Sequence, residues 1–354
     1  MDFQTSTDGE MTSQSPYDVS VVSVIKACLL GVTAASILLG NTTCLIVLRY
    51  THDGVSPVTK LFLISLTTSD LLVGVLVCIP IVGSTALQSW PYGDTYCTVV
   101  AMCHALYFNA GLSVLAINIE RYIAVIWPLR YPFIVTMARA AIVEIFIVAI
   151  LLLWTLLYVL LPGRKSFYYS NFNQCFIDFV VGTDFLGHLG MTVFIAVPLL
   201  VTVILHARLF LLANRHASRV GNITLGVINS DGRDTENVAS KPEQVEPPLD
   251  TQHKERLRTR KSPDAKAART FLIMAVVLTV SWTPYYTTIA WENLRTDPVP
   301  EALAFVSQIL LFLNSVWNVI IYYTRNRSFR KTANRLLGCC CRIRSRRRDQ
   351  DTIT

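Results

Sequence analysis

Some ionisable residues stand inside long apolar stretches of the sequence, where a charge is costly. Asp70 occurs in "LISLTTSDLLVGVLV", and Glu120 and Arg121 are neighbours in "LSVLAINIERYIAVIWPL". A carboxylate inside a bilayer costs several kcal/mol unless it has partners or binds a cation. These residue types therefore predict a cation-binding or hydrogen-bonded site around Asp70 and an ion pair between Glu120 and Arg121.

Polar residues in two other apolar stretches are candidate partners of Asp70. Asn41 lies in the first stretch, and Asn314, Ser315 and Asn318 lie in the last one. They reach Asp70 only if the first, second and seventh stretches meet in space. The alternative is a purely structural polar cluster, since hydrogen bonds between helices also join membrane spans.

The elements that position these residues are membrane helices. Of the 354 residues, 52% are hydrophobic and 16% charged, whereas soluble domains average about 25% charged residues. A helix needs about 20 apolar residues to cross a bilayer. The stretches that meet this requirement are 22–48, 58–84, 97–127, 138–162, 186–212, 267–291 and 301–323. The sequence therefore predicts an all-α membrane protein, a bundle of seven transmembrane helices.

The basic residues give the orientation of the bundle. If the N-terminus is extracellular, only Lys26, Arg164, Lys165 and Arg295 of the 31 Lys and Arg residues lie outside the cell. Lys and Arg concentrate on the cytoplasmic side of membrane proteins. The net charge of +7 therefore indicates the anionic inner leaflet and a cytosolic partner, not nucleic acid. We expect a multi-pass plasma-membrane protein with its N-terminus outside.

The remaining segments flank or interrupt the bundle. We expect an extracellular tail at 1–21, the bundle at 22–323, an amphipathic cytoplasmic helix at 324–338 and a tail at 339–354. Residues 214–264 combine prolines and mixed charges without apolar periodicity, which predicts a disordered third cytoplasmic loop. In the 324–338 segment, Phe329, Leu336 and Leu337 stand among cations, a pattern typical of a helix on the membrane surface.

The cysteines divide by location. Cys97 and Cys175 fall at the extracellular end of the third span and in the loop before the fifth, where disulfides form, so we predict a bond between them. Cys28, Cys44, Cys78 and Cys103 are interpreted as small packing residues. Juxtamembrane cysteines at Cys339, Cys340 and Cys341 predict palmitoylation.

Several motifs resemble the class A, or rhodopsin-like, G-protein-coupled receptors over nearly the whole chain. The matching motifs are "GN" with Asn41, "SLTTSDLL" with Asp70, "WPYG" at 90–93, Cys97 with Cys175, "ERY" at 120–122, Trp154, Pro198, "SWTP" with Trp282 and Pro284, and "NVIIY" at 318–322. Their order and the spans that carry them agree with the family.

The resemblance implies roles for individual residues. Glu120, and Asp264 at the start of the sixth span, are expected to restrain Arg121 until a G protein binds. The expected activation switch is Glu120, Arg121, Tyr122, Asp264, Trp282, Pro284, Asn318 and Tyr322. Asp70, Asn314, Ser315 and Asn318 resemble the family's allosteric sodium site. Heterotrimeric G proteins, arrestin, receptor kinases and membrane lipids are the implied partners.

Four departures from the family pattern bear on activation. Val319 replaces the proline of the seventh-span motif, His206 replaces the fifth-span tyrosine, and Leu278 replaces an aromatic residue one turn below Trp282. Arg121 follows Cys97 by 24 residues, one fewer than usual, so the family pattern does not fix the ligand-facing register at the top of the third span.

The extracellular half of the bundle predicts the ligand site. The residues expected to line it are Cys103, His104, Tyr107, Phe108, Phe194, Trp282, Tyr285, Tyr286, Gln308 and Phe312. The upper third span has no Asp or Glu after Cys97, which disfavours amine ligands, although Glu292 and Glu301 near the mouth could attract a cation. No lysine lies within the sixth or seventh span, which excludes a retinal Schiff base.

An aromatic, weakly polar cavity suits a small neutral or lipid-like molecule, or a small peptide. Short stretches, among them "SPDAKAARTFLIMAVVLTVSWTPY", also resemble the lipid-amide-sensing glucose-dependent insulinotropic receptor and the adenosine receptors. That resemblance implies coupling to Gs and a rise in cyclic AMP.

Two other classes of protein remain alternatives to a receptor. A transporter or channel usually shows internal repeats, paired broken helices or a polar stripe through several spans, which this sequence lacks. An intramembrane enzyme would need a nucleophile or a metal-ligand motif, and no such spacing occurs. We therefore expect no catalytic residues, no metal site and no cofactor other than an allosteric sodium ion.

Overall fold

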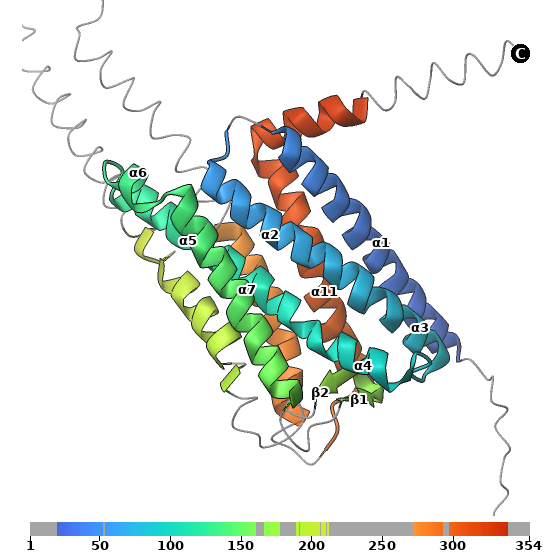
Figure 1. The fold of residues 1–354 in the computed structure, drawn as a ribbon. Helices are drawn as coiled ribbons and strands as arrows, with labels where there is room; N and C mark the ends of the chain where they lie inside the picture. The colour runs from blue at the N-terminus through green and yellow to red at the C-terminus, as the bar shows by residue number, and fades with distance from the viewer. Residues whose placement is uncertain are drawn as a thin grey trace, which may run out of the picture.

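A computed structural model describes residues 20–51, 54–160, 166–177, 189–190, 192–205, 207–209, 211, 272–292 and 297–338. Within these ranges seven helices are long and apolar enough to cross a membrane (Figure 1). They are Val21–Tyr50, Pro57–Leu87, Gly93–Ile126, Met137–Leu157, Thr192–Leu209, Leu272–Glu292 and Glu301–Arg325. The predicted seven-helix bundle is confirmed. The third span begins at Gly93, four residues before the predicted start.

The first, second and seventh spans pack together, as the Asp70 prediction requires. Helix α1 (Val21–Tyr50) contacts α2 (Pro57–Val73), α3 (Ile79–Leu87) and α11 (Glu301–Arg325). The start of α2 follows from its sequence, because the Ser56 hydroxyl accepts a hydrogen bond from the Thr59 amide at 3.1 Å and Pro57 occupies the first turn. The α2 helix also packs along α5 (His104–Ile126), which contains the Glu120–Arg121 pair.

Two spans contain a π-helical turn just before a proline. These turns are η1 (Gly74–Cys78), which precedes Pro80, and η3 (Thr192–Ala196), which precedes Pro198. Pro80 has no amide hydrogen to give to the carbonyl of Leu76. That oxygen instead accepts a hydrogen bond of 3.5 Å from the Tyr96 hydroxyl.

The third span is interrupted at Cys103, between α4 (Gly93–Met102) and α5. The Cys103 amide donates to both Val99 O at 3.0 Å and Val100 O at 3.1 Å, and Leu106 N donates to Cys103 O three residues back. Three-residue hydrogen bonds mark a locally tightened helix. This turn lies between Cys97 and Arg121, the stretch that is one residue shorter than in the family pattern.

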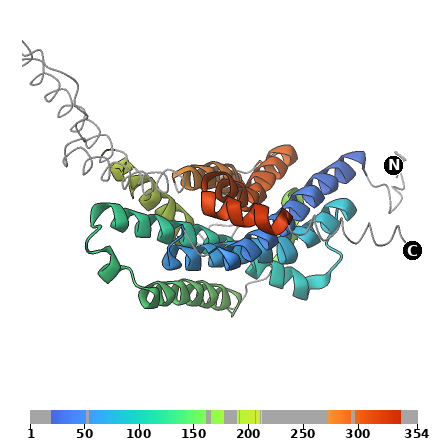
Figure 2. The ribbon, with the colours of Figure 1, turned by 90° about the horizontal axis from the view of Figure 1, so that it is seen from above.

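The fourth span, α7 (Met137–Leu160), lies at the edge of the bundle. Figure 2 shows it (green) as the outermost helix on one side, beyond α2 and α5. The short α6 (Tyr131–Ile134) precedes it at the cytoplasmic end. Most α7 side chains are exposed in the absence of lipid, and Ala140, Glu144 and Leu151 are buried.

Two further elements close the ends of the bundle. On the extracellular side, β1 (Ser166–Tyr169) pairs antiparallel with β2 (Gln174–Ile177) through the 3₁₀ turn η2 (Ser170–Phe172). On the cytoplasmic side, residues 327–338 form a helix that buries Phe329, whose ring lies 6.3 Å from that of Tyr322. The predictions for 1–19, for the third cytoplasmic loop at 214–264 and for Cys339, Cys340 and Cys341 fall outside the described residues.

Candidate functional site: a covered aromatic cavity, a buried aspartate and a cytoplasmic ion pair

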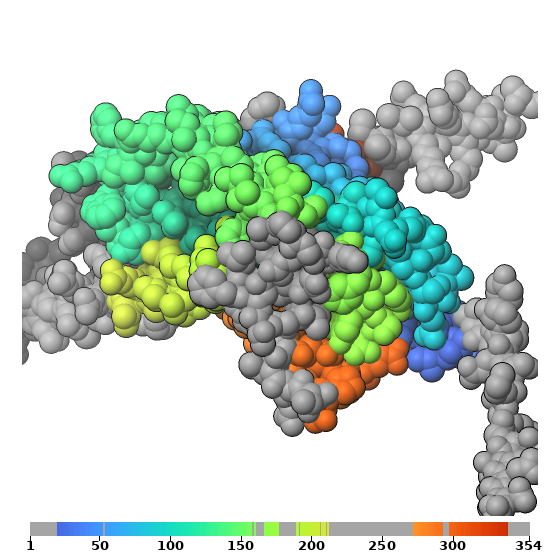
Figure 3. Space-filling view, turned by 60° about the horizontal axis from the view of Figure 1, so that its bottom comes forward, coloured from blue at the N-terminus to red at the C-terminus, as the bar shows by residue number. Residues whose placement is uncertain are grey.

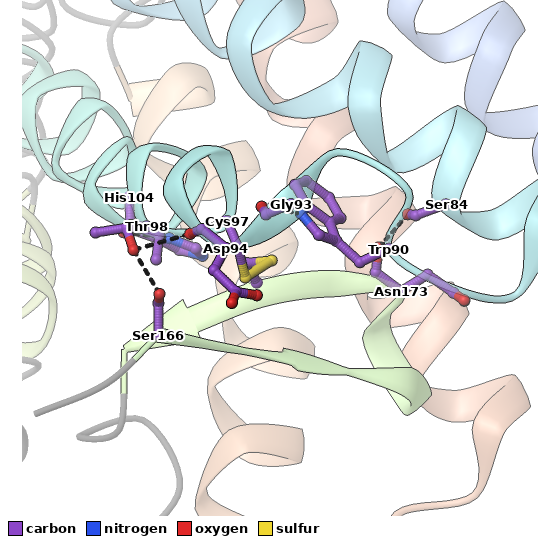
Figure 4. The surroundings of a disulfide bond; sticks show 11 residues. Ser84, Trp90, Gly93, Asp94, Cys97, Thr98, His104, Ser166 and Asn173 are labelled. Carbon is purple, nitrogen blue, oxygen red and sulfur yellow. Dashed lines mark hydrogen bonds between the residues drawn. A yellow bond between two sulfur atoms is a disulfide. The ribbon is translucent and has the colours of Figure 1, made fainter.

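The β1–β2 hairpin is fixed to the third span by the predicted disulfide. Cys97 of α4 and Cys175 of β2 are bonded, with Cα atoms 5.3 Å apart (Figure 4). Hydrogen bonds between the Thr98 and Ser166 hydroxyls, and from the Ser84 hydroxyl to the Asn173 carbonyl, hold the two ends of the hairpin. Figure 3 shows the hairpin (light green) between α4 (cyan) and the orange residues of the sixth and seventh spans. It therefore covers the extracellular mouth of the bundle.

The hairpin inserts side chains into the bundle. Phe172, Gln174 and Phe176 are each at most 2% exposed. Phe176 lies over His104, with ring centres 5.3 Å apart, and Phe172 meets Tyr285 edge to face at 5.7 Å. We refer to Phe172, Gln174 and Phe176 together as the lid.

Gln174 is the polar centre of this contact. Its Nε2 atom donates hydrogen bonds to the Tyr285 hydroxyl at 2.9 Å and to His104 Nε2 at 3.2 Å. His104 can accept because its Nδ1 atom lies 2.8 Å from the Ala101 carbonyl and donates there. The Gln174 Oε1 atom accepts from Gln308 Nε2 at 3.0 Å, and Gln308 also donates to the Phe172 carbonyl at 2.8 Å. The amide nitrogen and the amide oxygen of the buried Gln174 are thus both hydrogen-bonded to predicted ligand-site residues.

An aromatic cluster lies beneath the lid. The Tyr107 ring is 6.2 Å from Trp282 and 6.4 Å from Phe312, and Phe108 is 5.8 Å from Phe194 and 6.4 Å from Trp282. A small cavity remains between the lid and this cluster, lined by His104, Tyr107, Phe108, Phe176, Ile195, Trp282, Tyr285 and Leu311. The structure thus brings eight predicted ligand-site residues together, while Cys103 and Tyr286 are partly buried and do not line the cavity.

Sequence reasoning missed the lid residues as part of the ligand site. The available signal was their position next to Cys175, because a disulfide to the third span must hold its neighbours near the cavity. A second cavity lies below Trp282, and Leu278 is among its lining residues. It occupies the place where the family pattern has a larger aromatic side chain.

The carboxylates at the mouth are already engaged. Glu292 Oε1 accepts hydrogen bonds from the Val299 amide at 2.9 Å and from Asn171 Nδ2 at 3.3 Å. Burial, together with a hydrogen bond to Glu292, raises the pKa of Tyr169 on the hairpin. Glu301 forms an ion pair with Lys26. Glu292 therefore holds the hairpin to the sixth span and the following loop.

Asp70 lies where the sequence placed it, between the second and seventh spans. Its Oδ1 atom accepts from the Ser315 hydroxyl at 2.7 Å, and Oδ2 accepts from Asn318 Nδ2 at 3.0 Å. Asn41 Nδ2 donates a hydrogen bond to the Ser315 carbonyl at 3.3 Å, so the first span is also bonded to this group of residues. Asn314 is buried nearby on α11, and its Oδ1 atom has no hydrogen-bond partner within the described chain. Polar side chains of the first, second and seventh spans are thus gathered around one carboxylate.

The cytoplasmic ion pair is more extensively bonded than the sequence indicated. Arg121 donates from Nε to Glu120 Oε2 at 2.6 Å and from Nη2 to Glu120 Oε1 at 2.7 Å, a bidentate geometry. The Thr59 hydroxyl donates to Glu120 at 3.0 Å, and the Tyr131 hydroxyl also donates to Glu120. Burial and this bond raise the pKa of Tyr131. Asp264, the other expected partner of Arg121, lies outside the described residues, as does His206.

The other predicted switch residues also occupy the expected spans. Tyr322 is buried, and its hydroxyl has no hydrogen-bond partner among the residues described. Tyr122 is partly buried beside the ion pair in sequence, and Pro284 follows Trp282 within the sixth span. The seventh span runs without interruption past Val319 from Glu301 to Arg325.

The fold and these sites define a class of seven-helix receptors. The sequence profile described as "7 transmembrane receptor (rhodopsin family)" matches residues 40–322, so the chain belongs to this family. It is a G-protein-coupled receptor rather than an enzyme, and a multi-pass protein of the plasma membrane with an extracellular N-terminus. The family implies coupling to a heterotrimeric G protein.

Individual relatives are distant. The chain is 26% identical to the histamine H2 receptor of Rattus norvegicus over 321 residues, covering 90% of this chain and 79% of that receptor. It is 24% identical to the thyrotropin-releasing hormone receptor of Gallus gallus over 329 residues, covering 91% and 79%. Squid rhodopsin has the same fold, with a TM-score of 0.71 and 16% identity over 90% of this chain and 87% of that one. These comparisons do not support the narrower resemblance to the glucose-dependent insulinotropic and adenosine receptors.

Proposed function

We propose that this receptor binds a small neutral or lipid-like molecule in the aromatic cavity beneath the lid and activates Gs, raising cyclic AMP. The observation that carries this proposal is the wall of the cavity. Its polar groups are the imidazole of His104, the phenols of Tyr107 and Tyr285 and the indole of Trp282. Aromatic walls with a few hydrogen-bonding groups suit a largely apolar ligand.

A cationic amine is the ligand that the name of the histamine receptor relatives would favour. A buried cation needs a carboxylate partner. The cavity wall contains none among its described lining residues, and Glu292 is already bonded to the hairpin. The electrostatics therefore favour a neutral ligand over an amine.

The ligand must displace the lid in order to bind. Gln174 already uses the hydrogen-bonding groups of His104, Tyr285 and Gln308 that a ligand would address. A ligand that makes the same bonds, with apolar groups in place of Phe176, would replace the lid at little cost in unpaired polar atoms. Binding then shifts the population toward an open cytoplasmic side in which Arg121 leaves Glu120.

Further predictions from the family resemblance belong to the same proposal. Asp70, Asn314, Ser315 and Asn318 would bind an allosteric sodium ion, since hydroxyl, amide and carboxylate oxygens are hard ligands. Arrestin and receptor kinases would act on the active state, and Cys339, Cys340 and Cys341 would be palmitoylated.

The proposal is tested with purified receptor and G proteins. Nucleotide exchange on Gs, Gi and Gq is measured in lipid nanodiscs while lipid, nucleoside, amine and peptide libraries are added. We expect exchange on Gs in response to neutral or lipid-like compounds. A response confined to amines would contradict the proposed ligand class, and ion flux in liposomes without nucleotide exchange on any G protein would contradict the receptor function.

A further inference from the structure

A second buried carboxylate lies in the fourth span, away from the ligand cavity and the Asp70 cluster. Glu144 is 9% exposed and stands on the narrow buried stripe of α7, between Ala140 and Leu151. It is seven residues from Met137, where the helix begins. At 1.5 Å per residue this places it about 10 Å into the span, within the hydrocarbon region.

Hydrogen bonds connect Glu144 to two other spans. The Ser65 hydroxyl of α2 donates to Glu144 Oε1. Asn109 of α5 donates through Nδ2 to the Ser65 hydroxyl at 3.1 Å and to the Ser69 hydroxyl at 2.8 Å. Ser65 and Ser69 are one turn apart on α2, so a single amide bridges them. Three helices therefore meet at one set of polar side chains, Ser65, Ser69, Asn109 and Glu144, which we call the span-four cluster.

The span-four cluster has more acceptor oxygens than donors. Glu144 Oε2 and Asn109 Oδ1 are both buried and have no hydrogen-bond partner in the part of the chain that the structure describes. Ser65 contributes one hydroxyl hydrogen, which is directed to Glu144, and Asn109 directs its amide group to the two serines. An additional hydrogen on a carboxyl oxygen would correct this imbalance.

No described positive charge compensates Glu144. The acidic and basic residues described on the two helices that pack against α7 are bonded elsewhere. Lys60 donates to the Thr51 carbonyl, Asp70 accepts from Ser315 and Asn318, His104 bonds Ala101 and Gln174, and Glu120 pairs with Arg121. On α7 itself, Arg139 donates to the carbonyls of Phe133 and Ile134.

We propose that Glu144 is a proton-binding site of this receptor, and that the neutral carboxyl group joins the fourth span to the second and third. An ionised carboxylate in hydrocarbon without a paired cation carries a large desolvation penalty, which protonation removes. The proton also supplies the missing hydrogen-bond donor. Asn109 Oδ1 is available to accept this hydrogen bond, because Asn109 and Glu144 both bond the Ser65 hydroxyl and the Oδ1 atom has no described partner. The ligand of this site is a proton, and the site is independent of the ligand cavity.

Infrared spectroscopy of the full-length receptor in nanodiscs at neutral pH tests the proposal without any ligand or G protein. A protonated carboxyl group has a C=O stretch distinct from that of a carboxylate. We expect Glu144→Gln to remove one such band and Asp70→Asn to leave that band in place. A spectrum in which Glu144→Gln removes only carboxylate absorption would overturn the proposal.

Thermal unfolding of the same samples gives a second readout. Glutamine has nearly the shape and the hydrogen-bonding groups of a neutral glutamic acid, so Glu144→Gln should keep the wild-type unfolding temperature. Glu144→Ala should lower it, because Ser65 loses its acceptor. If Glu144→Gln lowers the unfolding temperature as much as Glu144→Ala, or fails to fold, the negative charge is required and the proposal is wrong. If the infrared band and the unfolding temperatures are as expected but the variants no longer signal, that loss bears on the proposed function and not on the proton-binding site.

Discussion

Asp70 of the second span accepts a 2.7 Å hydrogen bond from the hydroxyl of Ser315, which lies 245 residues further along the chain in the seventh span. Asn318 of the same span bonds the other carboxylate oxygen at 3.0 Å. This contact joins the second and seventh spans of the bundle. A cation at Asp70 would stabilise one arrangement of the spans over the other.

Replacing Asp70 by Asn should abolish stabilisation by sodium. A ligand that binds only the folded receptor raises its stability by mass action, and the carboxylate supplies most of the attraction for a cation. Thermal unfolding of the purified receptor is compared in sodium chloride and in choline chloride at equal ionic strength. We expect sodium to raise the unfolding temperature of the wild type and not that of Asp70→Asn. Ser315→Ala, which retains the charge, should keep part of the effect.

An equal sodium effect in wild type and Asp70→Asn would place the cation elsewhere. If sodium has no effect on the wild type, the contacts of Asp70 serve only to join the helices.

Replacing Glu120 by Ala should raise ligand-independent signalling. Arg121 loses two charge-assisted hydrogen bonds, of 2.6 and 2.7 Å. Such bonds contribute about 1.5–3 kcal/mol each, and about 1.4 kcal/mol shifts an equilibrium tenfold. Loss of even one such bond gives a shift of about tenfold, so we expect basal nucleotide exchange to rise at least tenfold. Tyr131→Phe, which removes one neutral donor to Glu120, should give a smaller rise. Unchanged basal exchange in Glu120→Ala at equal surface expression would show that this pair does not restrain the receptor.

Replacing Gln174 by Ala should loosen the lid. The change removes hydrogen bonds to Tyr285, His104 and Gln308 and leaves their buried polar groups unpaired, at a cost of about 1–3 kcal/mol each. Accessibility is measured as the rate at which a water-soluble thiol reagent modifies Cys103, which is free, partly buried and next in sequence to His104 of the cavity wall. A background without the other reactive cysteines, Cys28 and Cys339–Cys341, makes the signal specific.

We expect modification of Cys103 to become at least several-fold faster in Gln174→Ala. Ser166→Ala serves as the matched control, because it removes a hydrogen bond at the far end of the hairpin without touching the cavity wall. Equal rates in the two variants would mean that Gln174 does not hold the lid in place.

The sequence predicted the features that depend on apolar composition and on which side of the membrane a residue lies. Long apolar stretches identified all seven spans, and extracellular location identified the Cys97–Cys175 bond. The position of the lid depends on the path of the hairpin on either side of Cys175. The residues that neighbour Cys175 in the sequence do not determine that path. Glu144 was not singled out, because the sequence does not show that Ser65 of the second span bonds it or that Asn109 of the third span bonds the same serine.

Replacing Gly74 by Ala should destabilise the packing of the first two spans. A Cβ atom at Gly74 would lie 2.9 Å from Ile37 Cγ2 and 3.0 Å from Leu38 Cδ2, so these two methyl groups or the helices that carry them would have to shift. Overpacking of this kind costs about 1–3 kcal/mol, more than the gain of about 1 kcal/mol from placing Ala in a helix. Gly111→Ala is the matched control, since a Cβ atom there meets nothing within 4 Å among the described residues. Thermal unfolding in nanodiscs should show a lower unfolding temperature for Gly74→Ala and an equal or higher one for Gly111→Ala. A Gly74→Ala receptor as stable as Gly111→Ala would mean that the first and second spans separate at this point without cost.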